Sequence, residues 1–292
     1  MDQNYLSGDS SSRSGATPQL DSEQTTDLII ERARQLVNQL ILERGHDRPP
    51  FLPKDYSRLA GIKQILRADL GKTSAVLLRF QDGYVIKVNQ NHSVARQNFS
   101  GCHEIAHTLF GEPKLEHYLQ TIAYRNYNPQ RDDELRSKAR ERLCDIAASE
   151  LLMPEPVFRK YMSSFGLSIH LIERLANIFM ASIEAVTRRI AEVSSEPCIA
   201  TLWRRQKINA KVLQLAWRAG PANKPKSKNL YMPSHTRVTY PSTLHKAFEQ
   251  DIPITCHKQF RLDSGVKRIP MESKGFGRGD NRFVVSLAFP NR

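Results

Sequence analysis

A His-Glu-x-x-His pattern at residues 103–107 constrains the fold of this chain more than any other feature of its sequence. Glu104 follows the first histidine, His103, and His107 closes the pattern. Residues four apart share one face of an α-helix, so a helix here would present both imidazoles on the same side. A catalytic zinc needs three protein ligands and an open position for water. The pattern therefore predicts a helix that packs against a second element carrying a further ligand.

The residues around the pattern supply a start and an end for this helix. Ser93 is a candidate N-cap, and Gly111 with the following Glu-Pro pair ends the run. In such a site Glu104 can reach a metal-bound water, whose pKa the metal lowers towards ~7, and take its proton. An amphipathic helix with two polar histidines is the alternative, because chance gives this motif in a chain of this size with odds on the order of one in a hundred.

A third ligand is expected in the segment ERLCDIAASELLMP, on a predicted helix that stops before Pro154. Glu141 is the best candidate, because it lies 34 residues after His107, which leaves room for a loop and a second helix. Asp145 lies one turn further along the same face. A carboxylate there can accept the free N–H of a ligating imidazole and so fix its tautomer.

Spacing alone leaves the third ligand open. Glu134 and Glu150 lie on the same predicted helix as Glu141 and are rivals. A single acidic residue on so charged a helix face is most often only solvated. Glu134 has no acidic residue four positions on, and Glu150 lies where the apolar face closes before Pro154. These details favour Glu141 without deciding the question.

The sequence resembles the ImmA/IrrE group of zinc metallopeptidases over roughly residues 50–190. The segments GYVIKVNQNHSVARQNFSGCHEIAHTLFG and ERLCDIAASELLMP carry this resemblance, and the two in this order are far more specific than either alone. The resemblance implies a zincin-like metallopeptidase fold with one Zn²⁺ per chain. The roles that it implies are general base for Glu104 and zinc ligand for His103, His107 and Glu141.

The same resemblance implies a cytoplasmic protease with a narrow protein target. That target is typically a helix-turn-helix transcriptional repressor, cut to switch on stress or mobile-element genes. We therefore expect a zinc-dependent, site-specific endopeptidase. Two alternatives stay open, a non-catalytic regulator that binds DNA through residues 165–292 and a metal-sensing module that cleaves nothing.

The strongest β signal lies just before the expected metal-binding helix. Two runs rich in Val, Leu and Ile flank Asp82-Gly83, a common hairpin turn. The strand GYVIKVN could offer an edge on which an extended peptide lies, main chain to main chain. Candidate substrate-binding residues on this strand and the next helix are Tyr84, Ile86, Val88 and Arg96. Available oxyanion donors are Arg96, His117 and Tyr118.

The whole chain is predicted to be an α+β protein in four parts. These are a disordered tail at 1–25, a metallopeptidase domain with a small β-sheet at 26–160, a helix-turn-helix-like helical segment at 161–196, and a small α/β or mostly β domain at 197–292. The resembled family includes members with a sensory, GAF-like domain after the helical segment, and residues 197–292 fit that placement, although no motif identifies such a domain.

The helical segment has two interpretations. Ser182 would cap its last helix, and Arg188 and Arg189 lie late in that helix. They could contact DNA, or the helices could simply support the protease. We favour support, because a DNA-reading helix places basic and amide groups at its start. Here that start is Ile183-Glu184-Ala185, which would place an acidic group against phosphate.

Charge is distributed unevenly along the chain. The net charge is +13, and residues 197–292 hold 18 Lys plus Arg against 5 Asp plus Glu, whereas residues 1–196 hold 25 of each. Trp203 and Trp217 are interleaved with these basic residues. Such a region would attract nucleic acid without sequence choice and in a salt-dependent way. In the plainer interpretation the tryptophans belong to the core of a soluble domain with basic loops.

The cysteines and the apolar runs of the sequence indicate the compartment and the relation to membranes. The cysteines Cys102, Cys144, Cys198 and Cys256 form no Cys-x-x-Cys pair, which indicates reduced thiols. No apolar run approaches the ~20 residues that span a bilayer. The first residues lack the pattern of a signal peptide. We therefore expect a cytoplasmic protein with no membrane partner.

Overall fold

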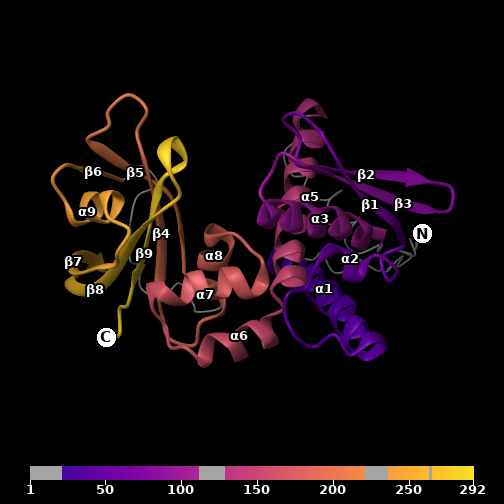
Figure 1. Cartoon of the computed structure of the whole chain (residues 1–292), viewed down its shortest axis with the longest axis horizontal. Coiled ribbons are helices and arrows are strands. Elements are labelled where there is room, and N and C mark those ends of the chain that lie inside the picture. The colour runs from indigo at the N-terminus through magenta and orange to yellow at the C-terminus, as the bar shows by residue number, and fades with distance from the viewer. Residues whose placement is uncertain (1–21, 112–128, 221–235, 263–264) are drawn as a thin grey trace, which may run out of the picture.

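Two β-sheets, joined by helices, organise the chain (Figure 1). The computed structural model describes residues 22–111, 129–220, 236–262 and 265–292. The predicted α+β class is confirmed, because the described residues form both helices and two separate sheets. The possible oxyanion donors His117 and Tyr118 lie outside the described residues. None of the described helices is long and apolar enough to cross a membrane.

The first sheet has three strands, β1 (Ile62–Ala68), β2 (Ala75–Phe80) and β3 (Gly83–Asn89), in the order β1-β3-β2. β2 and β3 form the predicted hairpin, closed by the pair Phe80 and Gly83. Gly83 has φ of 142°, and a Cβ there would lie 2.8 Å from the Gly61 carbonyl oxygen. Only glycine fits this turn without a shift of the backbone. β3 pairs with both neighbours, parallel to β1 and antiparallel to β2.

Four of the described helices accompany this sheet. They are α1 (Ser22–Arg44), α2 (Pro53–Tyr56), α3 (Val94–His107) with the 3₁₀ turn η1 (Thr108–Gly111), and α5 (Pro129–Leu152). α3 packs directly on the sheet, and the others pack on α3 or on one another. α1 begins at Ser22, so residues 22–25 are helical, although their composition suggested a disordered tail. Thr25 is fully buried, which explains the difference: the helix has a packed face there.

The close approach of α2 to α3 depends on Gly101. A Cβ on Gly101 would lie 2.6 Å from Cγ of Pro53, which is closer than real Cβ contacts come. The proline ring cannot rotate away, because its atoms are locked into the backbone. Gly101 therefore allows α3 to lie directly against α2, two residues before His103.

Three short helices follow, α6 (Glu155–Ser163), α7 (Ile169–Phe179) and α8 (Ile183–Val193). Met180 has φ of 50°, which ends α7 in the left-handed conformation. Ser182 caps α8 as predicted, because its Oγ accepts a hydrogen bond from the Ala185 N–H at 3.1 Å. Figure 1 places these helices between the two sheets.

The second sheet has six antiparallel strands in the order β6-β5-β4-β9-β8-β7. The strands are β4 (Ile199–Arg205), β5 (Val212–Ala219), β6 (Arg237–Thr239), β7 (Ile254–Leu262), β8 (Gly265–Phe276) and β9 (Phe283–Ala288). The helix α9 (Thr243–Glu249) packs on this sheet, and the 3₁₀ turn η2 (Gly279–Asn281) leads into β9. Trp203 is buried in the core between α9 and the sheet, as the plainer interpretation of the tryptophans expected.

The second sheet contacts α7 and α8 directly. The Trp217 indole N–H donates to Glu184 on α8 at 2.6 Å, and the Arg188 guanidinium lies 4.1 Å from the centre of the Trp217 ring. Lys274 on β8 forms an ion pair with Glu173 on α7 at 2.8 Å. Arg189 is buried and faces away from solvent, so it is not available to a DNA phosphate. These contacts support the packing interpretation of the helical segment.

Candidate metal centre

The helix α3 presents His103 and His107 on one face, as the sequence predicted. Ser93 caps this helix by accepting a hydrogen bond from the Arg96 N–H. The two imidazole ring centres lie 5.0 Å apart, with 70° between the ring planes. Both side chains are partly exposed, His103 at 15% and His107 at 23%, so ligands and solvent can reach them.

α5 brings Glu141 to both histidines. One carboxylate oxygen lies 3.0 Å from Nε2 of His103, and the other lies 3.6 Å from Nε2 of His107. Two ring nitrogens and a carboxylate that point at one another are the donor set of a catalytic zinc site. Glu134 and Glu150, the rivals in the sequence, do not take this position. Glu134 pairs with Lys138, and Glu150 is buried elsewhere.

Asp145 contacts the other nitrogen of His103. Its Oδ1 lies 2.9 Å from Nδ1 of that ring. If Nδ1–H donates to Asp145, Nε2 keeps its lone pair and faces Glu141, which is the tautomer that a metal requires. The sequence predicted this arrangement from the four-residue spacing of Glu141 and Asp145.

The surrounding charges separate the pKa values of the two histidines. For His103, burial lowers the pKa, but the carboxylates of Asp145, Glu141 and Glu104 together raise it above its ordinary value. For His107, burial and then the charge of His103 hold the pKa below its ordinary value. His107 is therefore the imidazole that is more readily neutral and able to donate a lone pair.

Glu104 lies on α3, and its carboxyl group contacts the backbone of the strand β2 at Leu77. Burial raises its pKa, as does the nearby Glu141 carboxylate, while the charge of His103 and a hydrogen bond from the Leu77 backbone oppose the rise. The net result is a pKa above the usual value for glutamate. A carboxyl group whose pKa is shifted towards neutrality is better suited to take up and return a proton.

Cys144 is a residue near the site that sequence reasoning missed. Its Sγ lies 3.5 Å from Nδ1 of His107, and potential ligand atoms of His103, His107 and Cys144 all lie within 4.8 Å of one another. Its place three residues after Glu141 puts it on the same side of α5, and this spacing was the available signal.

Glu141 and Cys144 compete as the third metal ligand, and we favour Glu141. Glu141 faces Nε2 of both histidines, whereas Cys144 contacts Nδ1, on the other edge of the His107 ring. Burial and the nearby carboxylates also raise the pKa of the Cys144 thiol, which disfavours the thiolate that binds metals. Cys144 is better placed to hold the His107 ring than to bind the metal itself.

The prediction that the strand GYVIKVN offers a free edge to a substrate is wrong. GYVIKVN is β3, the central strand, and both of its edges are already paired. Ile86 is fully buried and Val88 is 4% exposed, so neither can contact a substrate. The edges of this sheet are β1 and β2. Sequence periodicity identifies strands but does not show which strand lies between two others.

The two other candidates have different surroundings. Tyr84 is partly buried and packs on the core, which leaves it little freedom to bind a peptide. Arg96 donates a hydrogen bond to Oγ of Ser74, just before β2, at 2.9 Å. Arg96 also lies two helical turns before His103, on the side of α3 that faces β2. Of the four predicted residues, Arg96 alone stays a candidate for contact with substrate.

Comparisons with known proteins indicate a metallopeptidase domain in the part of the chain that holds these residues. A family model described as the IrrE N-terminal-like domain matches residues 61–191, which include every residue of the metal centre. The radiation response metalloprotease IrrE of Deinococcus radiodurans is 31% identical over 116 residues, which are 39% of this chain and 33% of that protein. The match therefore spans about a third of the relative's length.

A solved structure resembles nearly the whole chain. It is described as a Mycobacterium tuberculosis transcriptional regulator, and it matches with a TM-score of 0.57 over 91% of this chain and 81% of that one. The sequences are 16% identical, so the likeness establishes a shared fold and nothing about activity.

Proposed function

Because residues 61–191 match the model of the IrrE N-terminal-like domain, we propose that this chain is a zinc-dependent endopeptidase of the ImmA/IrrE family that cleaves one specific protein. The proposal rests chiefly on one observation, the convergence of Nε2 of His103, Nε2 of His107 and the Glu141 carboxylate. We further propose that the target is a helix-turn-helix transcriptional repressor, and that its cleavage controls stress or mobile-element genes.

His103, His107 and Glu141 would hold the zinc ion in this proposal. A bound zinc supplies a Lewis acid that polarises a peptide carbonyl and lowers the pKa of water. Glu104 takes the proton from the attacking water and returns it to the leaving amine. Asp145 keeps the His103 ring in one tautomer by accepting its Nδ1 proton.

The strand β2 is the best-placed edge for an extended substrate. It lies at the edge of the sheet, and its Leu77 backbone contacts the Glu104 carboxyl group. A peptide added to β2 would pair main chain to main chain and pass beside the general base. β2 thus takes the role that the sequence assigned to β3.

Zinc content and cleavage test this function together. We expect about one zinc per chain in the wild type and in Glu104→Gln, because Glu104 is not a ligand, and less zinc in Glu141→Gln. The wild type, incubated with zinc and a helix-turn-helix repressor encoded beside its gene, should give a discrete fragment, and Glu104→Gln should give none. Glu134→Gln is the matched control, because Glu134 lies on the same helix but pairs with Lys138. Unchanged cleavage by Glu104→Gln would contradict the proposal.

The uneven charge supports one alternative function. A non-catalytic regulator, which binds DNA or senses a metal, would use the basic region 197–292 and need no cleavage. Such a protein should shift DNA in a gel at low salt, and Glu104→Gln should do so equally well. No shift at low salt would remove this alternative.

A further inference from the structure

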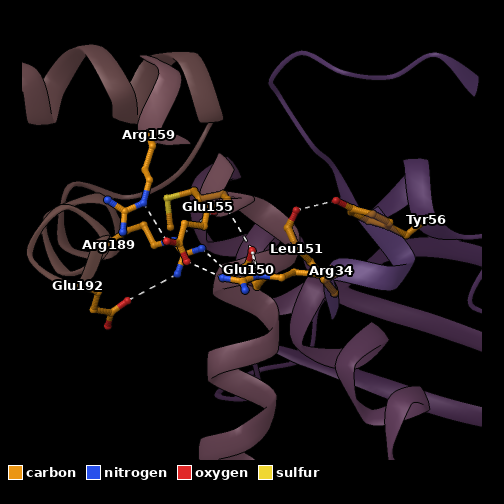
Figure 2. A network of polar contacts seen from close by, with 9 residues as sticks. Arg34, Tyr56, Glu150, Leu151, Glu155, Arg159, Arg189 and Glu192 are labelled. Atoms are coloured by element: carbon orange, nitrogen blue, oxygen red, sulfur yellow. Dashed lines mark hydrogen bonds and ion pairs between the residues drawn. The ribbon is translucent and has the colours of Figure 1, made fainter. Parts of the chain in front are cut away.

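A cleft of about 1390 Å³ opens between α1, α5 and α8, beside the metal centre. Its α5 wall includes Asp145, the residue that contacts His103. Its lining also includes the ion network of Figure 2, in which Arg34 of α1 and Arg189 of α8 donate to Glu150 of α5. A molecule bound in this cleft would therefore lie next to the site of cleavage.

The cleft is acidic, although the chain as a whole is strongly basic. Eight carboxylate side chains line it against five arginines, while the whole chain carries +13. Three of these arginines are already paired with carboxylates. Arg34 pairs with Glu150 and Glu155, Arg159 pairs with Glu155, and Arg189 pairs with Glu150 and Glu192 (Figure 2). These arginines add no net positive field, so an anionic ligand finds little attraction here.

The α1 wall carries exposed negative charge. Glu23, Asp27 and Glu31 follow at intervals of four, so they form one stripe along the helix, and all three are exposed. Carboxylates that line one wall of a concave surface focus the field and attract cations. The basic remainder of the chain would repel the same cations, which directs a cationic partner to this cleft.

The walls of the cleft favour a helix as the occupant. Its lining comes from helices and from Ser182, Ser194 and Ser195, which flank α8, and none of the strands that the structure describes lines it. An extended peptide would leave its backbone groups unpaired there, whereas a helix satisfies its own. A helix core about 10 Å wide would fill this volume over roughly 18 Å, which corresponds to roughly 12 residues.

We propose that this cleft is a docking site for a Lys/Arg-rich helix of the protein substrate. Docking there places the adjoining chain beside Asp145 and leads it across His103 and Glu104. The inference rests on the proposed function and specifies its substrate class. Helices that read DNA have the required charge, because they face phosphate. DNA and this cleft would then compete for one basic helix, so a repressor on its operator would be shielded from the protease.

Binding of a model helix tests the docking site without requiring cleavage. The probe is a fluorescent, side-chain-crosslinked helix of 14 residues with Lys and Arg on one face, measured by anisotropy against the zinc-loaded, full-length Glu104→Gln protein. Asp27→Lys/Glu31→Lys should weaken binding at least tenfold, because like charges then face the probe. Asp47→Lys/Asp280→Lys is the matched control, since both residues are exposed and lie outside the cleft. This control changes the net charge equally and should bind within about twofold of the parent.

Two results would overturn the docking site. One is equal binding by the two double variants, and the other is equally tight binding of the same peptide with a central proline that prevents a helix. The zinc content and the urea midpoint of each variant should equal those of the parent protein. Equal values would show that the fold is intact.

Cleavage kinetics separate failure of docking from failure of the proposed function. With a repressor that the wild type cuts, Asp27→Lys/Glu31→Lys should raise KM at least tenfold and leave kcat unchanged. Unchanged KM in that variant refutes docking but leaves the protease intact. Helix binding with no cleavage of any repressor refutes the protease but leaves the docking site.

Discussion

Two acidic groups on the helix α5, nine residues apart, have opposite surroundings. Glu141 is 52% exposed and faces two imidazoles at the surface, whereas Glu150 is 1% exposed and binds two guanidinium groups. Glu150 also accepts a hydrogen bond from the Glu155 N–H at 3.1 Å, so its carboxylate is fully used (Figure 2). One carboxylate is open to a metal and a substrate, and the other is closed within the fold.

This difference separates chemistry from structure on one helix. A buried carboxylate keeps its charge only when partners replace the lost water, and Arg34 and Arg189 do so for Glu150. Glu150 thereby joins α1, α5 and α8. Glu141 keeps contact with solvent. A metal can therefore replace a proton shared with a neighbouring imidazole without a large loss of folding free energy.

The largest expected effect is on stability, in Glu150→Ala. Removal of this carboxylate leaves the buried Arg189 with only the more distant Glu192, at 3.9 Å, as a charge partner, which should cost about 3–5 kcal/mol of unfolding free energy. Urea unfolding measures the loss. The control Glu134→Ala should leave the urea midpoint close to that of wild type, because Glu134 is on the surface. Comparable stabilities of the two variants would show that Glu150 does not hold the helices together.

A smaller effect is expected on zinc affinity, in Asp145→Ala. Loss of the partner of His103 Nδ1 should weaken zinc binding about 10–100-fold, because the ring is no longer held in one tautomer. Competition with a chelator measures this. Asp145→Asn should recover part of the affinity through its amide oxygen, and neither variant should change the urea midpoint much. A large loss of stability would instead place Asp145 with Glu150 as a structural residue.

The pH dependence of stability should reflect the network around Glu150. For Glu155, burial raises the pKa, but Arg159, Arg189 and Arg34 together hold it below its ordinary value. A lowered pKa in the folded state stabilises the fold above the unfolded pKa of about 4.3, and this stability is lost as the pH falls further. Glu155→Gln should therefore flatten the decline in unfolding free energy below roughly pH 5. An unchanged slope would show that Glu155 is not stabilised by these arginines.

The smallest effect on zinc affinity is expected in Cys144→Ala. This variant shows whether Cys144 only positions the His107 ring or binds the metal. If Cys144 only supports His107, zinc affinity should fall a few-fold, and Cys144→Ser should lie closer to wild type, because its hydroxyl can accept the Nδ1 proton. Glu141→Gln should weaken zinc binding much more. The reverse order would make Cys144 the third ligand.

The sequence predicted those parts of the site that depend on local spacing. His103, Glu104 and His107 needed only the helical period, and Asp145 followed from its distance to Glu141. The hairpin at Asp82-Gly83 and the Ser182 cap were also local, and both are confirmed. Glu141 required the family resemblance, because Glu134 and Glu150 on the same helix had equal chemistry.

The sequence did not predict features that depend on distant partners. β3 is central because β1, more than fifteen residues earlier, pairs with its second edge. The burial of Glu150 depends on Arg34 and Arg189, which lie 116 and 39 residues away. The place of Cys144 in the site can be recognised only once α5 is known to face His107. Periodicity identifies a helix or strand, but it does not show which residues of other elements meet it.

Gly101 has a consequence for any mutational library made across the active-site helix. Every other amino acid places a Cβ against the rigid ring of Pro53, so position 101 should not tolerate even alanine. Displacing α3 from α2 also shifts His103 relative to Glu141. In a growth or reporter screen, substitutions at Gly101 should therefore give the same inactive phenotype as loss of a zinc ligand, although residue 101 binds nothing. A screen that reads activity alone would count this glycine as catalytic, and only a parallel measure of folded protein would separate the two.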